Sequence, residues 1–187
     1  MITKRENMKQ LILLLCLQFS FCLNQEKDND KDRILLLGAL AISSPSSSSS
    51  ASVSDSSLSA ESRDSAQLTF FPNTPQSAFN SGISDKAHGS SILMKVNSTG
   101  KASINTATKS LLSGTFSEGS LVVKEIYSSG TLSLIAVMKK KNESPGGNWL
   151  WGEYSPSGTT VYSVNNNGSG CTGCHSKGKD YVRIFEY

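Results

Sequence analysis

The sequence contains few cysteines and histidines, and this scarcity narrows the kinds of metal site that it can form. Only four of its 187 residues are cysteine (Cys16, Cys22, Cys171 and Cys174), and only two are histidine. The first two cysteines lie in an N-terminal apolar segment, so the rest of the chain keeps a single Cys-x-x-Cys pair. A structural zinc site needs two further soft ligands, and no second pair supplies them. The composition therefore argues against such a site.

Long apolar runs and clustered positive charge are also missing. The apolar run at residues 11–23 is too short to span a bilayer comfortably, and a second run at residues 34–42 has only nine residues. The net charge is only +3, and no basic stripe is interleaved with aromatic residues. No nucleotide-binding loop is present either. We therefore expect no nucleic-acid partner.

The N-terminus has the layout of a secretory signal. Basic residues precede the apolar run, and a charged polar stretch follows it. We expect residues 1–21 to be a lipoprotein signal peptide and Cys22 to become the acylated first residue. Phe21 departs from the small residue usual at that position, so an ordinary cleaved signal or an uncleaved anchor are the alternatives. In each case the protein is exported, and we expect it on the periplasmic side or the outer membrane, held by a lipid anchor.

Residues 22–65 are predicted to be a disordered tether. Serine makes up 14 of the 23 residues 43–65, which leaves little to bury and nothing to offset the entropy of ordering. The apolar patch Ile34–Ile42 within this segment has three interpretations: it folds back on the domain, lies at the membrane surface, or packs on a partner.

The folded domain is predicted to be residues 66–187, which is long enough for one core. Period-two patterns and β-rich composition predict about five strands. These are residues 92–96, 121–127, 132–138, 149–154 and a short last strand at 181–185. A short helix is expected at residues 103–112, with Gly114 as its C-cap. Short turns between successive strands predict an α+β fold with an antiparallel sheet and one or two short helices.

Residues 171–175 (Cys-Thr-Gly-Cys-His) form the most informative motif. Two thiols three positions apart can reach the two vinyl groups on one edge of a porphyrin and form thioethers. The histidine that follows directly is then held under the iron. We therefore interpret Cys171 and Cys174 as haem attachment positions and His175 as the proximal iron ligand, with one haem c as the cofactor.

A redox dithiol and a plain disulfide are the alternatives for this motif. Redox dithiols begin a helix that follows a strand, where the helix dipole lowers the thiol pKa. Here residues 165–170 (Asn-Asn-Asn-Gly-Ser-Gly) predict a loop before the motif. The sequence therefore favours haem attachment.

Several segments of the chain occur in an order that resembles the cytochrome P-460 and cytochrome c′-β family. They are residues 117–125 (SEGSLVVKE), 136–140 (AVMKK), 147–151 (GNWLW), 171–175 (CTGCH) and 180–185 (DYVRIF). The resemblance extends over about residues 88–185. It implies an antiparallel sheet with flanking helices, a haem bound by the C-terminal motif, and an iron whose distal side is often left without a protein ligand.

The resemblance also singles out Lys124. It matches the lysine that is cross-linked to the porphyrin in true cytochromes P-460, although related proteins keep the lysine without a demonstrated cross-link. Alternation places Lys124 between apolar neighbours on one face of its strand. The alternative is a rim lysine paired with a carboxylate such as Glu125 or Glu153.

Other side chains are candidates for the distal side of the haem. Met94 and Met138 are candidate sixth ligands, but their alternating patterns favour core packing. His88 could cap the distal side, although an exposed loop position is the preferred interpretation. We assign the aromatic residues mainly to the core, with one or two walling the pocket.

Three functions remain open. The first is a haem protein that binds a small diatomic ligand, NO or CO, at an open distal side or performs redox chemistry there. The second is an oxidoreductase acting on hydroxylamine or a related small nitrogen compound, with Lys124 cross-linked to the haem and Glu125 or Glu153 moving protons. The third is a simple electron carrier with a redox partner protein. Whether two copies pair into a homodimer is also open.

Overall fold

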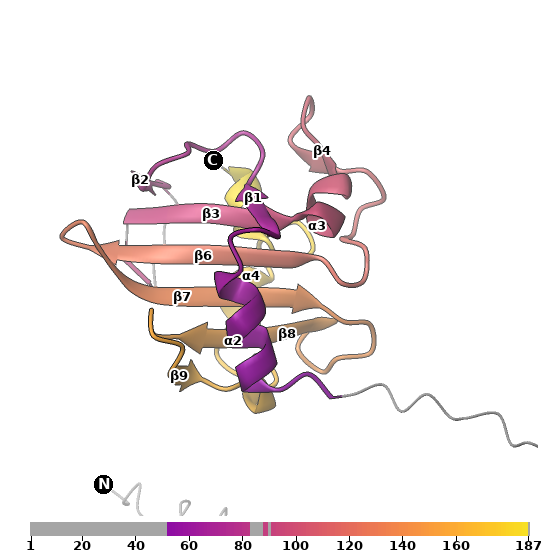
Figure 1. Cartoon of the computed structure of the whole chain (residues 1–187). Helices are drawn as coiled ribbons and strands as arrows, with labels where there is room; N and C mark the ends of the chain where they lie inside the picture. The colour runs from indigo at the N-terminus through magenta and orange to yellow at the C-terminus, as the bar shows by residue number, and fades with distance from the viewer. Residues whose placement is uncertain (1–51, 83–87, 90, 187) are drawn as a thin grey trace, which may run out of the picture. The chain divides into compact units, whose positions relative to one another are not determined.

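An antiparallel sheet runs through the part of the chain that the computed structural model describes, residues 52–82, 88–89 and 91–186. Its strands in spatial order are β1-β3-β6-β7-β8-β9, and β2 also pairs with β3 (Figure 1). Their bounds are β1 Leu68–Phe70, β2 Phe79–Asn80, β3 Ser91–Asn97, β6 Leu121–Ser128, β7 Thr131–Lys140, β8 Trp149–Tyr154 and β9 Thr160–Tyr162. The predicted α+β class with an antiparallel sheet is confirmed.

The alternation along the central strands sends apolar side chains to both faces of the sheet. In β6, Val122 and Ile126 join one buried cluster, while Leu121 and Val123 join another. Successive side chains on a strand point to opposite faces, so each cluster belongs to one face. Lys124 shares the face of Val122 and Ile126.

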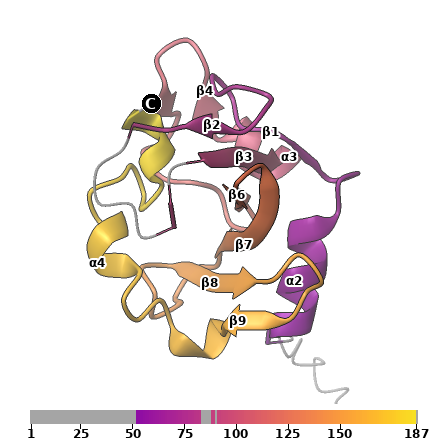
Figure 2. The same cartoon turned by 90° about the vertical axis from the view of Figure 1, so that its left-hand side faces the viewer.

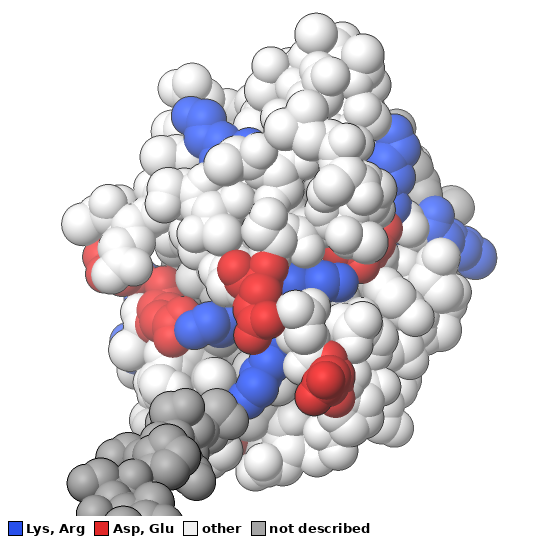
Figure 3. Space-filling view, turned by 90° about the vertical axis from the view of Figure 1, so that its right-hand side faces the viewer, with Lys and Arg blue, Asp and Glu red and all other residues white. Residues whose placement is uncertain are grey.

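Short helices cover the two faces. Helix α2 (Asp55–Arg63) lies on one side of the sheet, and α4 (Thr172–His175) lies on the other, as Figure 2 shows. Two 3-10 turns, η1 (Val164–Asn166) and η2 (Arg183–Glu186), flank α4 in the sequence. The face turned to the viewer in Figure 3 carries acidic and basic side chains interspersed with one another.

Helix α2 corrects the end of the predicted tether at residues 22–65, of which residues 22–51 lie outside the described part of the chain. Ser54 and Ser57 form a capping box at its start, so serine here begins a helix rather than preventing order. Leu58 is completely buried against the sheet. The ordered unit therefore begins before residue 66, the predicted domain boundary.

The predicted helix at residues 103–112 is also wrong. The helix in this region is α3 (Ser98–Ala102), and its start is capped by the Asn97 side chain, which accepts a hydrogen bond from Gly100 N at 2.9 Å. A small two-stranded sheet follows, β4 (Ile104–Asn105) with β5 (Ser110–Leu111). Asn105 closes it, because its side chain accepts hydrogen bonds from two backbone amides in the turn.

The short last strand predicted at residues 181–185 is a 3-10 turn instead. Asp180 and Tyr181 both have left-handed backbone angles, with φ of 45° and 66°, which interrupts any extended segment. The chain then enters η2 and returns its apolar side chains Val182 and Ile184 to the buried cluster under α4.

Three predictions for the N-terminal part lie outside the described residues: the signal peptide 1–21, acylation of Cys22, and the role of Ile34–Ile42. Within the described part of the chain, no helix combines the length and apolarity needed to cross a membrane.

Candidate functional site

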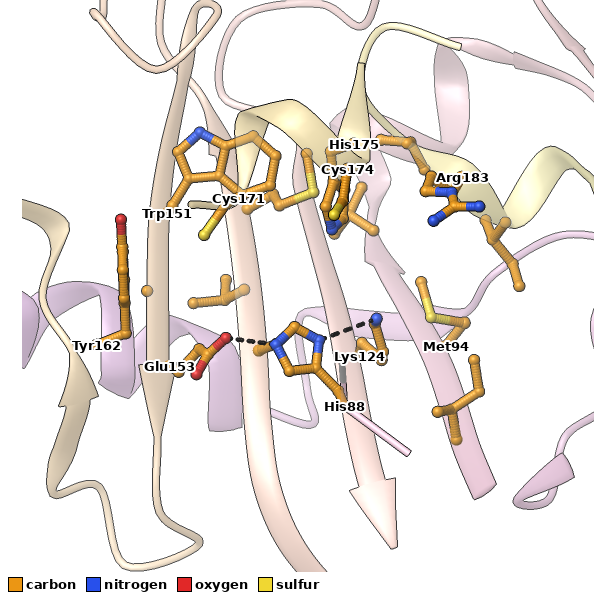
Figure 4. A pocket seen from close by; sticks show the side chains of 18 of the residues that line it. His88, Met94, Lys124, Trp151, Glu153, Tyr162, Cys171, Cys174, His175 and Arg183 are labelled. Atoms are coloured by element: carbon orange, nitrogen blue, oxygen red, sulfur yellow. Dashed lines mark hydrogen bonds and ion pairs between the residues drawn. The ribbon is translucent and has the colours of Figure 1, made fainter. Parts of the chain in front are cut away.

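A pocket opens between one face of the sheet and the C-terminal segment (Figure 4). It encloses about 1100 Å³ of free space, with its opening included. The floor is formed mainly by side chains of β3, β6, β7 and β8, and the opposite wall by residues 170–175 and 182–184. Most of the lining is apolar, and the polar groups in it are few. Such a combination is typical of a site for a cofactor or a small ligand.

The motif Cys171–His175 is held against the pocket by a tight turn. Gly168 precedes it with φ of 72°, and a Cβ at this position would lie 2.6 Å from the indole of Trp151. A residue with a side chain would therefore push α4 away from β8. Glycine lets the motif approach the sheet, where Cys171, Cys174 and His175 all line the pocket.

His175 is oriented by its backbone surroundings. Its Nδ1 lies 2.8 Å from the carbonyl oxygen of Tyr181. A carbonyl only accepts hydrogen bonds, so Nδ1 carries the proton and the neutral ring keeps a lone pair on Nε2. The ring also meets the edge of Trp151, with centroids 4.8 Å apart and planes at 76°. Removal from water lowers the pKa of His175 to about 4, which makes the imidazole neutral at neutral pH.

The two thiols are free rather than joined in a disulfide. Cys171 is partly buried and Cys174 is exposed. Burial raises the pKa of the Cys171 thiol, with a smaller opposing effect from a hydrogen bond with Tyr162. A nucleophilic redox thiol requires a lowered pKa instead. The environment of Cys171 therefore disfavours the redox dithiol alternative.

A polar group lies across the pocket floor. His88 Nε2 is 2.6 Å from a carboxylate oxygen of Glu153, and His88 Nδ1 is 3.4 Å from Nζ of Lys124. Dashed lines mark both contacts in Figure 4. Because an ionised carboxylate only accepts hydrogen bonds, Nε2 carries a proton and donates a hydrogen bond to Glu153. Only 21% of the His88 side chain is exposed, so the preferred expectation of an exposed loop histidine is wrong.

Burial and charge displace the pKa values of this polar group. Desolvation lowers the pKa of Lys124, and the nearby Glu153 carboxylate opposes this effect. The hydrogen bond from His88 holds the pKa of Glu153 below its ordinary value, against the effect of burial. The structure therefore concentrates a proton donor, a carboxylate and an amine at one side of the pocket.

The remaining candidates divide between the two faces of the sheet. Met94 and Met138 line the pocket and are also part of the buried cluster. Glu125 lies away from the pocket, where it pairs with Lys95 and accepts a hydrogen bond from Tyr127. Of the two carboxylates considered for proton transfer, only Glu153 therefore reaches the pocket.

Two further residues line the pocket that were not predicted from the sequence, Tyr162 and Arg183. Tyr162 donates a hydrogen bond to Ser169 O at 2.8 Å, and burial raises its pKa to about 12. Arg183 lies in the segment 180–185 that carries part of the resemblance, which was the available signal for it.

The donor set suits a haem. The pocket brings a neutral imidazole with a free Nε2 lone pair together with two unpaired thiols and apolar walls. In contrast, no three His, Cys, Asp or Glu side chains gather as metal ligands within residues 52–82, 88–89 and 91–186. The chemistry of the site thus matches a porphyrin better than a bare metal ion.

Comparison with known proteins supports this assignment. No curated protein sequence matches the chain. A family model does match, over residues 102–185, a range that begins later than the predicted residue 88 and includes the whole motif. The family indicates a haem-binding protein. The family is described as Cytochrome P460, so the predicted resemblance to the cytochrome P-460 group is confirmed over these residues.

Proposed function

We propose that the protein is an exported c-type haem protein that binds a small diatomic ligand such as NO or CO, or performs redox chemistry, at a haem with an open distal side. The observation that carries the proposal is the state of His175. Its Nδ1 proton is engaged by the Tyr181 carbonyl, and its neutral Nε2 is left available as a ligand. Cys171 and Cys174, which we propose as the two attachment thiols, line the same pocket as His175.

The side chains of the pocket have separate roles in this proposal. Cys171 and Cys174 hold the cofactor through thioethers, and His175 supplies the proximal ligand. When bound, the haem supplies an iron that takes a sixth ligand or changes its oxidation state. Apolar side chains from the sheet, including Met94 and Met138, keep water away from the bound ligand.

The polar group on the pocket floor supports a role in proton movement. His88 bridges Glu153 and Lys124, with contacts of 2.6 Å and 3.4 Å. An imidazole can take a proton at one ring nitrogen and release one at the other. His88 can therefore hold a proton inside the pocket while it contacts the Glu153 carboxylate, which is only 17% exposed.

A second candidate function is oxidation of hydroxylamine or a related nitrogen compound. It is favoured by the position of Lys124, which lines the pocket on the face of β6 shared with Val122. Its lowered pKa increases the fraction of neutral amine, the form needed for a bond to a porphyrin carbon. In this candidate Lys124 is cross-linked to the haem and Glu153 is the carboxylate that moves protons. A third candidate, a periplasmic electron carrier, requires a sixth protein ligand, for which Met94 and Met138 line the pocket.

We test the proposal by expressing the full chain with a c-type haem maturation system and recording pyridine haemochrome and ferric and ferrous absorption spectra. A covalent c-type haemochrome with a high-spin ferrous band is expected. The C171A/C174A variant should lose covalent haem. Absence of haem from the wild-type protein under working maturation contradicts the proposal. A low-spin, six-coordinate spectrum in both oxidation states favours the electron carrier.

Intact-mass and peptide-mass analysis of the same protein separates the second candidate. Two thioethers and an unmodified Lys124 contradict the cross-link. The matched comparison is K124M against K95M, because Lys95 lies in the neighbouring strand and pairs with Glu125 outside the pocket. Whether or not Lys124 is cross-linked, K124M should change the haem spectrum and K95M should not. If Lys124 is cross-linked, K124M should also remove one covalent bond between the protein and the haem.

We also propose that the protein acts on the periplasmic side or at the outer membrane, anchored through acylated Cys22. The basic and apolar layout of residues 1–21 supports export. Labelling with a radioactive fatty acid tests the anchor, with C22S and C16S as a matched pair. Label that survives C22S contradicts acylation at Cys22.

A further inference from the structure

The carbonyl that orients His175 belongs to an unusual backbone segment. Tyr181 follows Asp180, and both residues have positive φ values of 66° and 45°. Left-handed angles at residues other than glycine cost about 1–3 kcal/mol each and persist only where the surroundings enforce them. The Tyr181 carbonyl therefore reaches His175 Nδ1 because other contacts hold this segment in place.

The carboxylate of Asp180 provides two of these contacts. One oxygen lies 2.8 Å from Nζ of Lys140, and the other accepts a hydrogen bond from the backbone amide of Phe116 at 2.8 Å. The Lys140 and Asp180 side chains expose only 4% and 6% of their area. Each charge is thus compensated by the other away from water, where removal of one partner is strongly unfavourable.

Lys140 is itself fixed within the sheet. It is the last residue of β7, and its backbone amide donates to Ser120 O at 2.8 Å. Its ammonium group lies 5.0 Å from the ring centroid of Trp149, which gives a cation–π contact in addition to the ion pair. The position of Asp180 is therefore set by a rigid strand rather than by the loop that contains it.

Two backbone hydrogen bonds connect the position of Asp180 to that of the Tyr181 carbonyl. Lys179 N donates to Val182 O at 3.1 Å, and Val182 N donates to Lys179 O at 2.9 Å, so Asp180 and Tyr181 form the tip of a closed turn. Gly178 precedes this turn, and a Cβ there would lie 2.6 Å from the Val182 backbone. A displacement of Asp180 therefore moves the neighbouring Tyr181 carbonyl.

We propose that the buried Lys140–Asp180 pair is a positioning device for the proximal ligand: it holds the Tyr181 carbonyl at His175 Nδ1 and thereby sets the reduction potential of the haem. The inference rests on the proposed function in that His175 ligates the iron. A hydrogen bond from Nδ1 makes a ligating imidazole more basic. A more basic ligand stabilises ferric iron, so an intact pair keeps the potential low.

The test compares two double variants of the haem-loaded full chain. K140M/D180N removes both buried charges together, which avoids leaving one uncompensated. K139M/E61Q is the matched control, because Lys139 is the preceding residue of β7 and pairs with Glu61 of α2 at 2.7 Å on the opposite face. Circular dichroism and thermal unfolding establish that each variant is folded.

Reduction potential and the iron–histidine stretching frequency in the ferrous Raman spectrum are the readouts. We expect K140M/D180N to shift the ferric–ferrous equilibrium about tenfold toward ferrous iron, equal to ~59 mV for one electron, and to lower the stretching frequency. K139M/E61Q should leave both unchanged. A second readout is the ¹⁵N NMR signature of His175 in the diamagnetic ferrous CO complex, where the Nδ1 proton should lose its hydrogen bond and exchange faster with solvent only in K140M/D180N.

Each outcome decides the inference. A folded K140M/D180N protein with an unchanged potential and stretching frequency overturns it, as does an equal shift in K139M/E61Q. If K140M/D180N does not fold, K140Q/D180N takes its place, since it also removes both charges, its two amides can hydrogen-bond to each other, and the amide oxygen at position 180 still accepts from Phe116 N. Failure of both to fold makes the pair a folding requirement and overturns the positioning role. Wild-type protein without covalent haem contradicts the proposed function instead, and the haemochrome of the same preparations distinguishes the two failures.

Discussion

Replacement of Trp151 by phenylalanine is expected to lower the free energy of unfolding more than the same change at Trp149. Both indoles lie on β8 and are almost completely buried, with 3% and 0% of their area exposed. Nε1 of Trp151 donates a buried hydrogen bond to Gly146 O at 2.8 Å. Nε1 of Trp149 is buried and has no hydrogen-bond partner in the described part of the chain.

The magnitude follows from this difference. The smaller ring loses packing at both positions, but Trp151→Phe also leaves the Gly146 carbonyl unpaired, which costs about 1–3 kcal/mol for a buried polar group. Trp149→Phe removes an unpaired donor. We therefore expect the loss of unfolding free energy to be about 1–2 kcal/mol larger for Trp151→Phe than for Trp149→Phe. Urea unfolding followed by circular dichroism measures it, and the dependence of the free energy on urea concentration should be equal in the two variants.

The same pair of variants has a spectroscopic consequence. Of the two indoles, only Trp151 contacts the His175 ring directly, with centroids 4.8 Å apart, so its replacement should alter the spectrum of the haem-loaded protein more than replacement of Trp149, which is connected to His175 indirectly, through Lys140 and Asp180. Equal losses of stability in the two variants would refute the hydrogen bond as the cause. A spectral change of similar size in Trp149→Phe would refute the role assigned to the contact between Trp151 and His175.

Three further changes have defined outcomes. Leu58→Ala should lower the free energy of unfolding by about 2–5 kcal/mol in urea titrations, because Leu58 of α2 is fully buried against the sheet; a loss below about 0.5 kcal/mol would place the helix outside the folded unit. Gly178→Ala should lower the free energy of unfolding by about 1–3 kcal/mol, because the added Cβ would lie 2.6 Å from the Val182 backbone. Gly173→Ala, whose Cβ would have no neighbour within 4 Å, should change it by less than about 0.5 kcal/mol. Similar melting temperatures for the two variants would contradict the close approach at Gly178. The pKa of Glu153 is lowered from 4.5 in the folded protein, so its ionised form stabilises the fold above that pH, and this stability is lost as the pH falls. His88→Ala should reduce the dependence of the unfolding free energy on pH between about pH 3 and 6. An unchanged slope of unfolding free energy against pH would contradict this role of His88.

The central strands were predictable because their signal is local. Alternation of side chains over residues 92–96, 121–127, 132–138 and 149–154 follows directly from burial on a pleated sheet, and the strands β3, β6, β7 and β8 cover these ranges. The helix predicted at residues 103–112 failed because composition favoured it, whereas the Asn97 and Asn105 side chains satisfy backbone amides in a different arrangement.

Burial by distant residues explains the other differences. A serine-rich segment predicts disorder when considered alone, but Leu58 finds a buried position on a sheet formed by residues far along the chain. The motif of residues 171–175 and the lysine of β6 were identifiable from the sequence, and the structure brings both to one pocket. His88 and the Lys140–Asp180 pair were not assigned to the site, because their partners lie tens of residues away and no spacing rule connects them.

The carboxylate of Asp55 has a consequence for the order in which the protein folds. It accepts hydrogen bonds from Tyr154, Ser163 and Val164, which are 99, 108 and 109 positions later in the chain. A contact between such distant positions forms slowly, because the entropy of closing the loop precedes any stabilisation. During synthesis from the N-terminus, helix α2 cannot dock until β8 and η1 have emerged. Only six residues then separate Val164 from Cys171, so α2 docks and the motif of residues 171–175 emerges at almost the same moment.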